Sequence, residues 1–321
     1  MKAATVRRYG GPEVVRIEEV PTPVARPGEL RVRVTAAAVT AADARLRAND
    51  APRGFGFLMR CATGLRRPRR PISGMAFAGV VDALGPGVAG FTVGQRVFGS
   101  TGLRGGAHAE YLTIATDRRV FPLPDTLSDP EGAALCFGGL TATDFLMDKS
   151  GLRPGERLLI NGATGAVGSA AIRIGRHLDA HITAVARVEN HRFARTLGAH
   201  EAIDYRDGPL SGRWDVILDV VGTLPYASAA PLLAPGGRLL PVTATLGEQL
   251  SYALRRRRGG HVVTSGIVAD DRAASQRLVR LHATLGYRPV IGELFPFAKI
   301  AEAHARAGAR HNRGTLVVTL P

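Results

Sequence analysis

The feature that most restricts how this chain can fold is a strand-like run leading into a glycine-rich turn and then a helix-like segment. The apolar run 158–161 (LLIN) is followed by Gly162-Ala163-Thr164-Gly165-Ala166-Val167-Gly168. Glycines at this spacing let the backbone turn sharply and approach a pyrophosphate, while the helix start presents free N–H groups. The pattern predicts a dinucleotide site. The alternative is a tight turn with a structural role only.

The segments around this turn alternate between strand-like and helix-like patterns, which indicates βαβ units and a doubly wound parallel sheet. The expected strands are 157–161, 181–186, 214–220, 238–242 and 261–265, and the expected helices are 167–178, 190–197 and 226–233. A last helix at 297–307 and a last strand at 315–320 are expected to join a different domain.

That other domain is the first part of the chain, which reads as short β-segments separated by Pro and Gly. Leu30, Val32 and Val34 alternate with polar residues, as in a half-buried strand. The runs 77–84 and 109–114 have the same character. The fold class is therefore α/β, with a small β-rich domain beside the parallel-sheet domain.

Composition narrows the location and the partners. No apolar run is long enough to span a membrane and no secretory signal is visible, so we expect a cytoplasmic protein. The two cysteines, Cys61 and Cys136, are too few for a disulfide framework. The net charge is +15, but 39 of the 42 basic residues are arginines, which is as typical of a coding bias as of an anionic partner.

The residue after the second expected strand bears on the choice of cofactor. An acidic residue there would bind the ribose 2′-hydroxyl of NAD, whereas an arginine accommodates the 2′-phosphate of NADP. The strand 181–186 is followed by Arg187, and Glu189 comes two positions later. We therefore expect NADPH as the cofactor, with an ordinary exposed loop arginine as the alternative.

Several further motifs occur in a fixed order along the chain. They are Gly28-Glu29-Leu30, Pro71-Ile72-x-Gly74, Val93-Gly94-x-Arg96-Val97-Phe98-Gly99, Gly105-Gly106-Ala107-x-Ala109-Glu110-Tyr111, Gly139-Leu140-Thr141-Ala142, Pro154-Gly155-Glu156, Leu197-Gly198-Ala199 and Ile203-Asp204-Tyr205. With the glycine turn, they make nearly the whole chain resemble the zinc-independent medium-chain dehydrogenase/reductase family, specifically its quinone oxidoreductase-like members.

The resemblance implies a GroES-like domain over 1–125, completed by 292–321, and a Rossmann NADP-binding domain over 126–291, with the active site in the cleft. It is compatible with a homodimer. It also implies cofactor-binding roles, from the nicotinamide end to the adenine end and the closing tail, for Thr40, Thr141, Gly162 to Gly168, Arg187, Asn190, Tyr205, Val221, Gly222, Thr243, Ala244, Thr245 and Asn312.

The chain departs from the family pattern at three places. Asn190 stands where a lysine is common, so Arg187 has to supply the charge for a 2′-phosphate. Ala76 replaces an acidic residue, and Thr40 replaces the usual Asn before Ala41-Ala42-Asp43. Asp43 is the one ionisable residue that the resemblance places near the cleft, either as a proton relay or as a cap of the following helix.

The sequence gives little support for a catalytic metal site or for a nucleophilic side chain of a hydrolase. Catalytic zinc needs three protein ligands, but Gly74-Met75-Ala76 stands where a Gly-His-Glu would be needed and the histidines are scattered. His108 is expected to be a surface or packed residue rather than a proton donor. Ser169 lacks the Gly-x-Ser-x-Gly elbow of a hydrolase. We expect no metal.

Two arginine runs, 66–70 and 255–258, are either solvated faces or rims that attract anions. Neither is interleaved with aromatic residues, which argues against nucleic acid. The expected function is NADPH-dependent, metal-free hydride transfer to a quinone or an enone. The expected partner is a small-molecule substrate, and an anionic substrate is one option. The alternatives are a carbonyl or alcohol oxidoreductase of this fold, and a cofactor-bound protein that binds RNA or an acidic partner.

Overall fold

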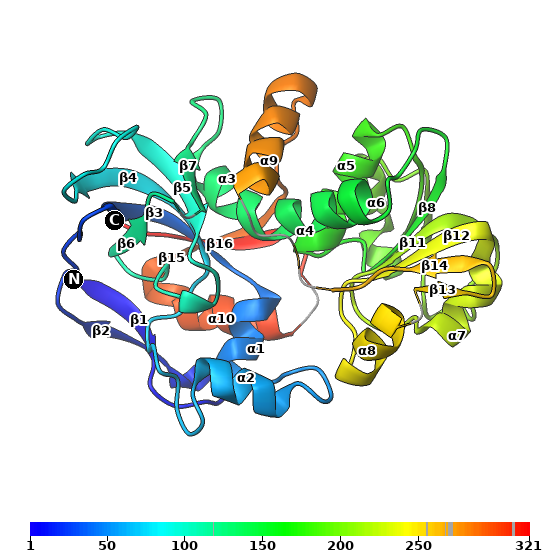
Figure 1. Cartoon of the computed structure of the whole chain (residues 1–321), viewed down its shortest axis with the longest axis horizontal. Coiled ribbons are helices and arrows are strands. Elements are labelled where there is room, and N and C mark those ends of the chain that lie inside the picture. Colours follow the sequence, from blue (N-terminus) through cyan, green and yellow to red (C-terminus); the bar gives the residue numbers. More distant parts are fainter. Residues whose placement is uncertain (118, 255, 267, 269–271, 310–311) are drawn as a thin grey trace. The chain divides into compact units, whose positions relative to one another are not determined.

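The computed structural model describes residues 1–117, 119–254, 256–266, 268, 272–309 and 312–321. The chain divides into two compact units (Figure 1). Unit 1 consists of Met1–Ala51, Gly56–Phe137 and Asp270–Pro321, and unit 2 consists of Pro52–Phe55 and Gly138–Ala269. Within the described residues, no helix is long and apolar enough to cross a membrane.

Unit 1 is built on a mixed sheet with the strand order β15-β16-β3-β4-β5-β7, and β6 also pairs with β3. A separate antiparallel pair is formed by β1 (Lys2–Val6) and β2 (Val15–Glu19). The strands of the large sheet are β3 (Glu29–Val39), β4 (Ala76–Leu84), β5 (Arg96–Ser100), β6 (Tyr111–Ala115), β7 (Arg119–Pro122), β15 (Ile291–Pro296) and β16 (Thr315–Thr319).

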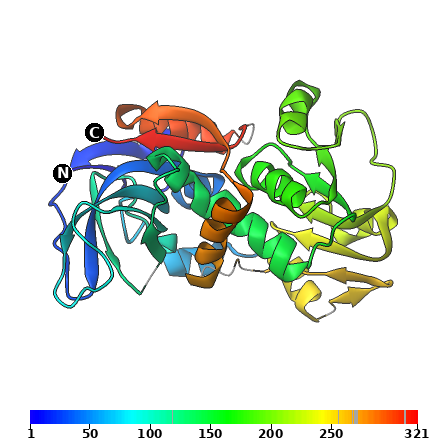
Figure 2. The same ribbon diagram turned by 90° about the horizontal axis from the view of Figure 1, so that it is seen from above.

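The alternation in the first part of the chain explains β3. Leu30, Val32 and Val34 are fully buried in the core of unit 1, as the period of two predicts. The α-helices of this unit are α1 (Ala41–Ala48), α2 (Gly56–Thr63), α3 (Asp129–Ala134), α9 (Arg272–Leu285) and α10 (Ile300–Gly308). Figure 2 shows β15 and β16, orange and red, side by side, so the last strand joins the β-rich unit as expected.

Unit 2 is a parallel sheet with the strand order β10-β9-β8-β11-β12-β14-β13, in which the short β13 is antiparallel. Apart from β13, this is the 3-2-1-4-5-6 order of a Rossmann fold. The strands are β8 (Arg157–Asn161), β9 (His181–Val185), β10 (Glu201–Ile203), β11 (Trp214–Asp219), β12 (Leu233–Pro241), β13 (Arg257–Arg258) and β14 (His261–Val263).

Buried apolar runs form the central strands of this sheet. Leu158, Leu159 and Ile160 are fully buried, as expected for a parallel strand covered on both faces. The α-helices of unit 2 are α4 (Leu140–Thr143), α5 (Ala166–His177), α6 (His191–Thr196), α7 (Tyr226–Ala229) and α8 (Leu246–Leu254). The predicted α/β fold class, a β-rich unit beside a doubly wound parallel sheet, is confirmed.

The division into units differs from the expected domain boundaries. Residues 126–137 and 270–291, which the sequence analysis places in the Rossmann domain, belong to unit 1. α3 and α9 lie in these segments. α3 contacts β3, β4 and β5, and α9 contacts β7, which is why both helices count with the β-rich unit.

Candidate functional site

The glycine-rich turn follows β8 and leads directly into α5. Gly162 has a φ of +83°, a conformation that side chains rarely adopt. A Cβ atom on Gly168 would lie 2.2 Å from the carbonyl oxygen of Gly162, so only glycine lets the helix pack this close to the turn. A Cβ atom on Gly165 would meet nothing within 4 Å. The first and last glycines therefore shape the turn, and the middle one leaves open space.

That open space lies at the start of α5, whose first amide groups have no carbonyl partner inside the helix. The residue before the helix is Gly165, which has no side chain to cap these amides. The helix is 12 residues long, and its N-terminal end carries a partial positive charge. Free amides, open space and a positive helix end are what a pyrophosphate group requires, so the turn fits the expected dinucleotide.

The structure brings most of the predicted cofactor residues to one edge of the unit 2 sheet. β8, β9, β11 and β12 run parallel, so their carboxyl ends share an edge. The turn residues Gly162 to Gly168 follow β8, Arg187 follows β9, Val221 and Gly222 follow β11, and Thr243, Ala244 and Thr245 follow β12. The order in which strands are added to the sheet reverses between β8 and β11, the position at which ligands bind in open α/β sheets.

Asp219, which the sequence analysis did not single out, organises this edge. Its buried carboxylate accepts hydrogen bonds from Asn161 Nδ2 at 2.8 Å, from the Gly222 amide at 3.0 Å and from the Leu224 amide at 2.8 Å. It thereby ties the end of β8 to the loop after β11. Thr243 Oγ1 donates to the carbonyl oxygen of Val220 at 3.2 Å and extends the same network to β12.

Arg187 lies in a cluster of charged groups at this edge. Its Nε donates to Tyr205 Oη at 2.9 Å, which joins two predicted cofactor residues. One guanidinium nitrogen of Arg187 lies 3.8 Å from Glu189. Arg206, absent from the predicted set, bonds Glu189 at 3.1 Å and Asp204 at 2.6 Å. This pairing holds the pKa of Asp204 well below its usual range and raises that of Arg206.

The remaining predicted cofactor residues are spread over both units. Asn190 directly precedes α6 in unit 2, and Thr141 is buried on α4. Thr40 and Asn312 lie in unit 1, where Asn312 precedes β16 and has a buried Oδ1 without a hydrogen-bond partner among the described residues. The approach of Thr40, Thr141 and Asn312 to the cofactor stays a prediction.

Thr40 and Asp43 together cap α1. The Asp43 carboxylate accepts hydrogen bonds from the Thr40 amide at 2.8 Å and from Thr40 Oγ1 at 2.6 Å, and the Asp43 amide donates back to Thr40 Oγ1 at 3.3 Å. This reciprocal capping box explains why the chain has a Thr-x-x-Asp sequence here. Of the two roles considered for Asp43, the helix-capping role is confirmed, and a role in proton transfer stays a prediction.

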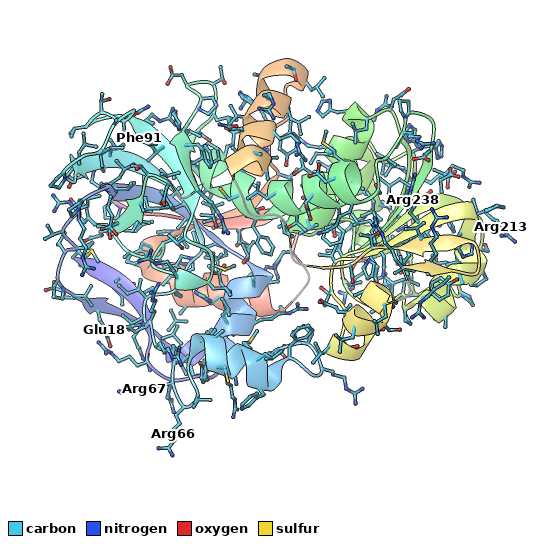
Figure 3. All side chains as sticks on the ribbon, in the orientation of Figure 1. Glu18, Arg66, Arg67, Phe91, Arg213 and Arg238 are labelled. Atoms are coloured by element: carbon cyan, nitrogen blue, oxygen red, sulfur yellow. The ribbon has the colours of Figure 1, made fainter. Side chains whose placement is uncertain are left out.

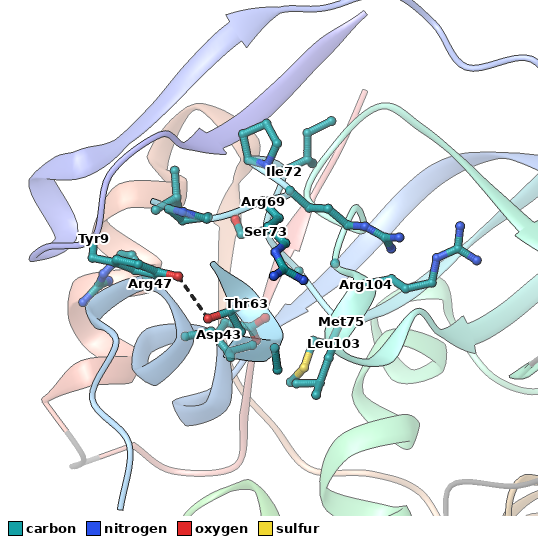
Figure 4. Close-up of a pocket in the computed structure, with 18 residues that line it drawn as sticks. Tyr9, Asp43, Arg47, Thr63, Arg69, Ile72, Ser73, Met75, Leu103 and Arg104 are labelled. Carbon is teal, nitrogen blue, oxygen red and sulfur yellow. Dashed lines mark hydrogen bonds between the residues drawn. The ribbon is translucent and has the colours of Figure 1, made fainter. Parts of the chain in front are cut away.

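A pocket of about 340 Å³ lies within unit 1 beside this capping box (Figure 4). Asp43 and Ser73 lie in its wall, together with apolar side chains and with several arginines. Ser73 Oγ lies 3.0 Å from Nδ1 of His108, whose Nε2 lies 2.9 Å from the carbonyl oxygen of Ala38. His108 is fully buried, so the expectation of a packed histidine is confirmed.

His108 forms a buried pair with His304 of α10. The His304 Nε2 atom lies 3.4 Å from His108 Nδ1, and the rings meet edge to face. Arg47 donates to the carbonyl oxygen of His304 at 3.2 Å. Burial lowers the pKa of both histidines, with that of His304 well below its usual range; Asp43 opposes the shift at His108. Both rings are therefore neutral at pH 7.

The thiols and possible metal ligands show no constellation for catalysis. Within the described part of the chain, no group of three or more His, Cys, Asp or Glu side chains is placed to hold a metal ion. Cys136 is buried, which raises the pKa of its thiol to about 12 and makes it a poor nucleophile. Cys61 is exposed on α2.

Comparison with protein families gives one match in each part of the chain. Residues 26–125 match the alcohol dehydrogenase GroES-like domain, and residues 197–318 match a family described as zinc-binding dehydrogenase. The first match covers most of the strands of unit 1, and the second begins within unit 2 after the glycine turn.

Individual relatives cover the whole chain. The quinone oxidoreductase of Sus scrofa is 28% identical over 98% of this chain and 95% of its own length. The solved quinone oxidoreductase of Coxiella burnetii is 25% identical, covers 100% of this chain and 99% of its own and has a TM-score of 0.88. The quinone oxidoreductase of Thermus thermophilus, solved also with NADPH, is 30% identical over 100% of both chains with a TM-score of 0.78.

Proposed function

This chain belongs to the medium-chain dehydrogenase/reductase family, among its quinone oxidoreductase-like members, and from this premise we propose that it is an NADPH-dependent, metal-free reductase of quinones or enones. The observation that carries the proposal is the glycine turn at the start of α5 with Arg187 at the end of the next strand. Support for NADPH also comes from the Thermus thermophilus relative, which binds it.

The residues of unit 2 have distinct tasks in this proposal. The amides at the start of α5 bind the pyrophosphate, and Gly165 gives it room. Arg187, held by Tyr205, binds the 2′-phosphate through charge-assisted hydrogen bonds. Asp219 keeps the Val221-Gly222 loop in place along the ribose. When bound, NADPH supplies the hydride.

The substrate pocket proposed here is the one in unit 1. A quinone takes up the hydride and one proton and leaves as the hydroquinone; an enone takes the hydride at its β-carbon and the proton at the α-carbon. Polar N–H and O–H groups stabilise the negative charge that develops on the substrate oxygen. Asp43 is buried and its Oδ2 caps α1, so we propose that the proton comes from water.

The same proposal excludes a requirement for zinc. Met75 and Ala76 stand beside Gly74 in the pocket region, and neither side chain is a zinc ligand. Without a metal to polarise an alcohol, reduction of a quinone or of an activated double bond is the better supported reaction.

The test is NADPH oxidation, followed by its absorbance, against 1,4-benzoquinone, 1,4-naphthoquinone, 2-cyclohexenone and benzaldehyde. We expect turnover with the quinones or the enone, slower turnover with NADH, and unchanged rates after dialysis against EDTA. Gly165→Val, which fills the open space before α5, is expected to abolish turnover. Activity confined to benzaldehyde, or activity lost on chelation and restored by zinc, would contradict the proposal.

A further inference from the structure

Four of the residues that line the pocket in unit 1 are arginines. Arg69 and Arg70 reach its wall from the loop after α2, and Arg104 reaches it from the short 3-10 helix Gly102–Arg104 (Figure 4). All three side chains are exposed. Arg47 also lines the pocket, but it is buried and donates to the carbonyl oxygens of Gly10 and His304.

The three exposed arginines have no acidic partner in the described part of the protein. No side-chain hydrogen bond or ion pair joins Arg69, Arg70 or Arg104 to another described residue. Arginines elsewhere do find carboxylates: Arg31 bonds Asp82 at 2.5 Å and Arg96 bonds Asp129 at 2.6 Å. The positive charge of these three arginines is therefore not neutralised by any described acidic side chain and is available to a bound anion.

The one carboxylate in the pocket wall does not neutralise this charge. Asp43 is only 2% exposed, and its Oδ2 is held by the amide and hydroxyl of Thr40. The exposed charged groups of the pocket wall are consequently guanidinium groups. Uncompensated positive charge around a concave surface attracts anions, and arginine binds carboxylate and phosphate in a bidentate manner.

The loop that carries Arg69 and Arg70 is fixed at several points. Tyr9 Oη donates to the carbonyl oxygen of Gly64 at 2.7 Å and lies 3.0 Å from Thr63 Oγ1 (Figure 4). The Arg69 amide donates to the carbonyl oxygen of Thr63 at 2.7 Å. Gly64 has a φ of +132° and contacts Arg67 so closely that a Cβ atom there would lie 2.0 Å from the Arg67 carbonyl oxygen. The arginines are thus presented by a defined loop.

Much of the rest of the pocket wall is apolar. Leu46, Ile72, Met75 and Leu103 line it beside the arginines. A volume of about 340 Å³ is at the lower end of the range for small-molecule sites. The combination suits one compact molecule with an apolar body and a negatively charged end.

We propose that the unit 1 pocket binds a small amphipathic acid, whose carboxylate or phosphate is held by Arg69, Arg70 and Arg104 and whose apolar body packs against Leu46, Ile72 and Met75. Where this acid is the molecule that is reduced, the inference rests on the proposed function and makes an acidic quinone or enone the preferred substrate. The binding site itself stands on the pocket alone.

The sequence offers a matched control in the same loop. Arg66 and Arg67 are exposed, carry the same charge as Arg69 and Arg70, and do not line the pocket. Figure 3 shows both of them projecting from the surface of unit 1. The double variants Arg69→Ser/Arg70→Ser and Arg66→Ser/Arg67→Ser therefore lower the net charge equally but differ in what they remove from the pocket.

The experiment is isothermal titration of the full chain, saturated with NADP⁺, with three probes that cannot be reduced by hydride. The probes are 2-naphthoate, 2-naphthyl phosphate and the neutral 2-naphthamide. We expect the parent protein to bind one of the two acids at least tenfold more tightly than the amide. The acid that binds more tightly identifies the carboxylate or the phosphate as the preferred end.

We further expect Arg69→Ser/Arg70→Ser to weaken binding of the preferred acid at least tenfold and Arg66→Ser/Arg67→Ser to change it less than twofold. Circular dichroism checks that both variants fold, and Arg104→Ser provides an independent variant with the same expected direction. An equal loss of affinity for the acid in the two double variants would show an effect of general surface charge and overturn the proposal. Equal affinity of the parent protein for the acid and the amide would also overturn it.

Turnover separates this inference from the proposed function. Acid binding that depends on Arg69 and Arg70 in a protein that oxidises no NADPH with any quinone or enone supports the binding site and contradicts the reductase. The opposite result is quinone turnover with acid binding that does not change when Arg69 and Arg70 are substituted. That result supports the reductase and contradicts the acid-binding site.

Discussion

At the scale of single residues, the choice between the two nicotinamide cofactors depends on a balance of charges around Arg187. Glu189 lies 3.8 Å from Arg187 and is bonded more closely by Arg206, at 3.1 Å. Arg206 is also paired with Asp204. Glu189 is therefore paired more closely with Arg206 than with the guanidinium that we expect to bind the 2′-phosphate. Arg206 and Glu189 are 17 positions apart in the sequence.

We predict that Arg187→Ala lowers the preference for NADPH over NADH by about tenfold or more, because a charge-assisted hydrogen bond contributes roughly 1.5–3 kcal/mol. Glu189→Gln should increase the preference, since it removes a negative charge near the 2′-phosphate. Fluorescence titration of both nucleotides measures the ratio. Arg192→Ala, on the neighbouring helix α6, is the control. An unchanged ratio in Arg187→Ala would exclude the assigned role.

At the scale of elements, α10 packs against the rest of unit 1 at a pair of buried histidines that must stay neutral. His304 of α10 faces His108 and Arg47, and His108 also faces Asp43. Nε2 of His108 lies 2.9 Å from the carbonyl oxygen of Ala38, so it carries the proton and Nδ1 is an acceptor. The His304 Nδ1 atom is buried without a hydrogen-bond partner among the described residues, as fits a neutral ring.

This arrangement predicts that stability falls as the pH falls below about 6.5, the usual histidine value. The pKa of His304 is lowered in the folded state, so the unfolded chain binds more protons and gains stability relative to the folded one on acidification. The effect can reach about 1.4 kcal/mol per pH unit for each histidine.

We expect His304→Gln to show a smaller loss of unfolding free energy than the parent on acidification from about pH 6.5 to about pH 5, measured by urea denaturation. The background from the net charge of +15 is common to both proteins, so their difference isolates the histidine. Identical slopes in the two proteins would show that His304 takes no part.

How far the sequence predicts these elements depends on how local their causes are. The turn at Gly162 to Gly168 and the Thr40–Asp43 cap are formed within a few residues, and both are visible in the sequence. The histidine pair joins residues 196 positions apart. Asp219 gains its role from amides of a loop that no periodic pattern describes. Such contacts depend on tertiary folding, so composition and spacing do not indicate them.

At the scale of the whole molecule, the two units have separate hydrophobic cores, and only unit 2 contains a tryptophan whose fluorescence can report unfolding. Trp214, the only tryptophan, is 1% exposed in β11 of unit 2, and its Nε1 donates to Thr183 Oγ1 at 3.1 Å. Its fluorescence therefore reports the unfolding of unit 2. Circular dichroism reports the helices and strands of both units.

We predict that NADP⁺ raises the thermal midpoint seen by Trp214. A ligand at about 100 times its Kd stabilises the folded state by about 2.7 kcal/mol, which corresponds to a shift of roughly 5 °C or more. NAD⁺ at the same concentration should give a smaller shift. Equal shifts with the two nucleotides, or a shift seen by circular dichroism but absent from the Trp214 signal, would contradict a cofactor site in unit 2.

The position of β16 has a consequence for how the protein is made. This strand, Thr315–Thr319, lies inside the unit 1 sheet, between β15 and β3, and not at its edge. During synthesis on the ribosome, every residue of unit 2 leaves the exit tunnel before β16 does. Unit 2 can therefore fold while the chain is still growing, whereas the Ala36–Val39 end of β3 stays without its β16 partner until Thr315–Thr319 appear. Until then, this open edge of β3 is exposed to pairing with other chains.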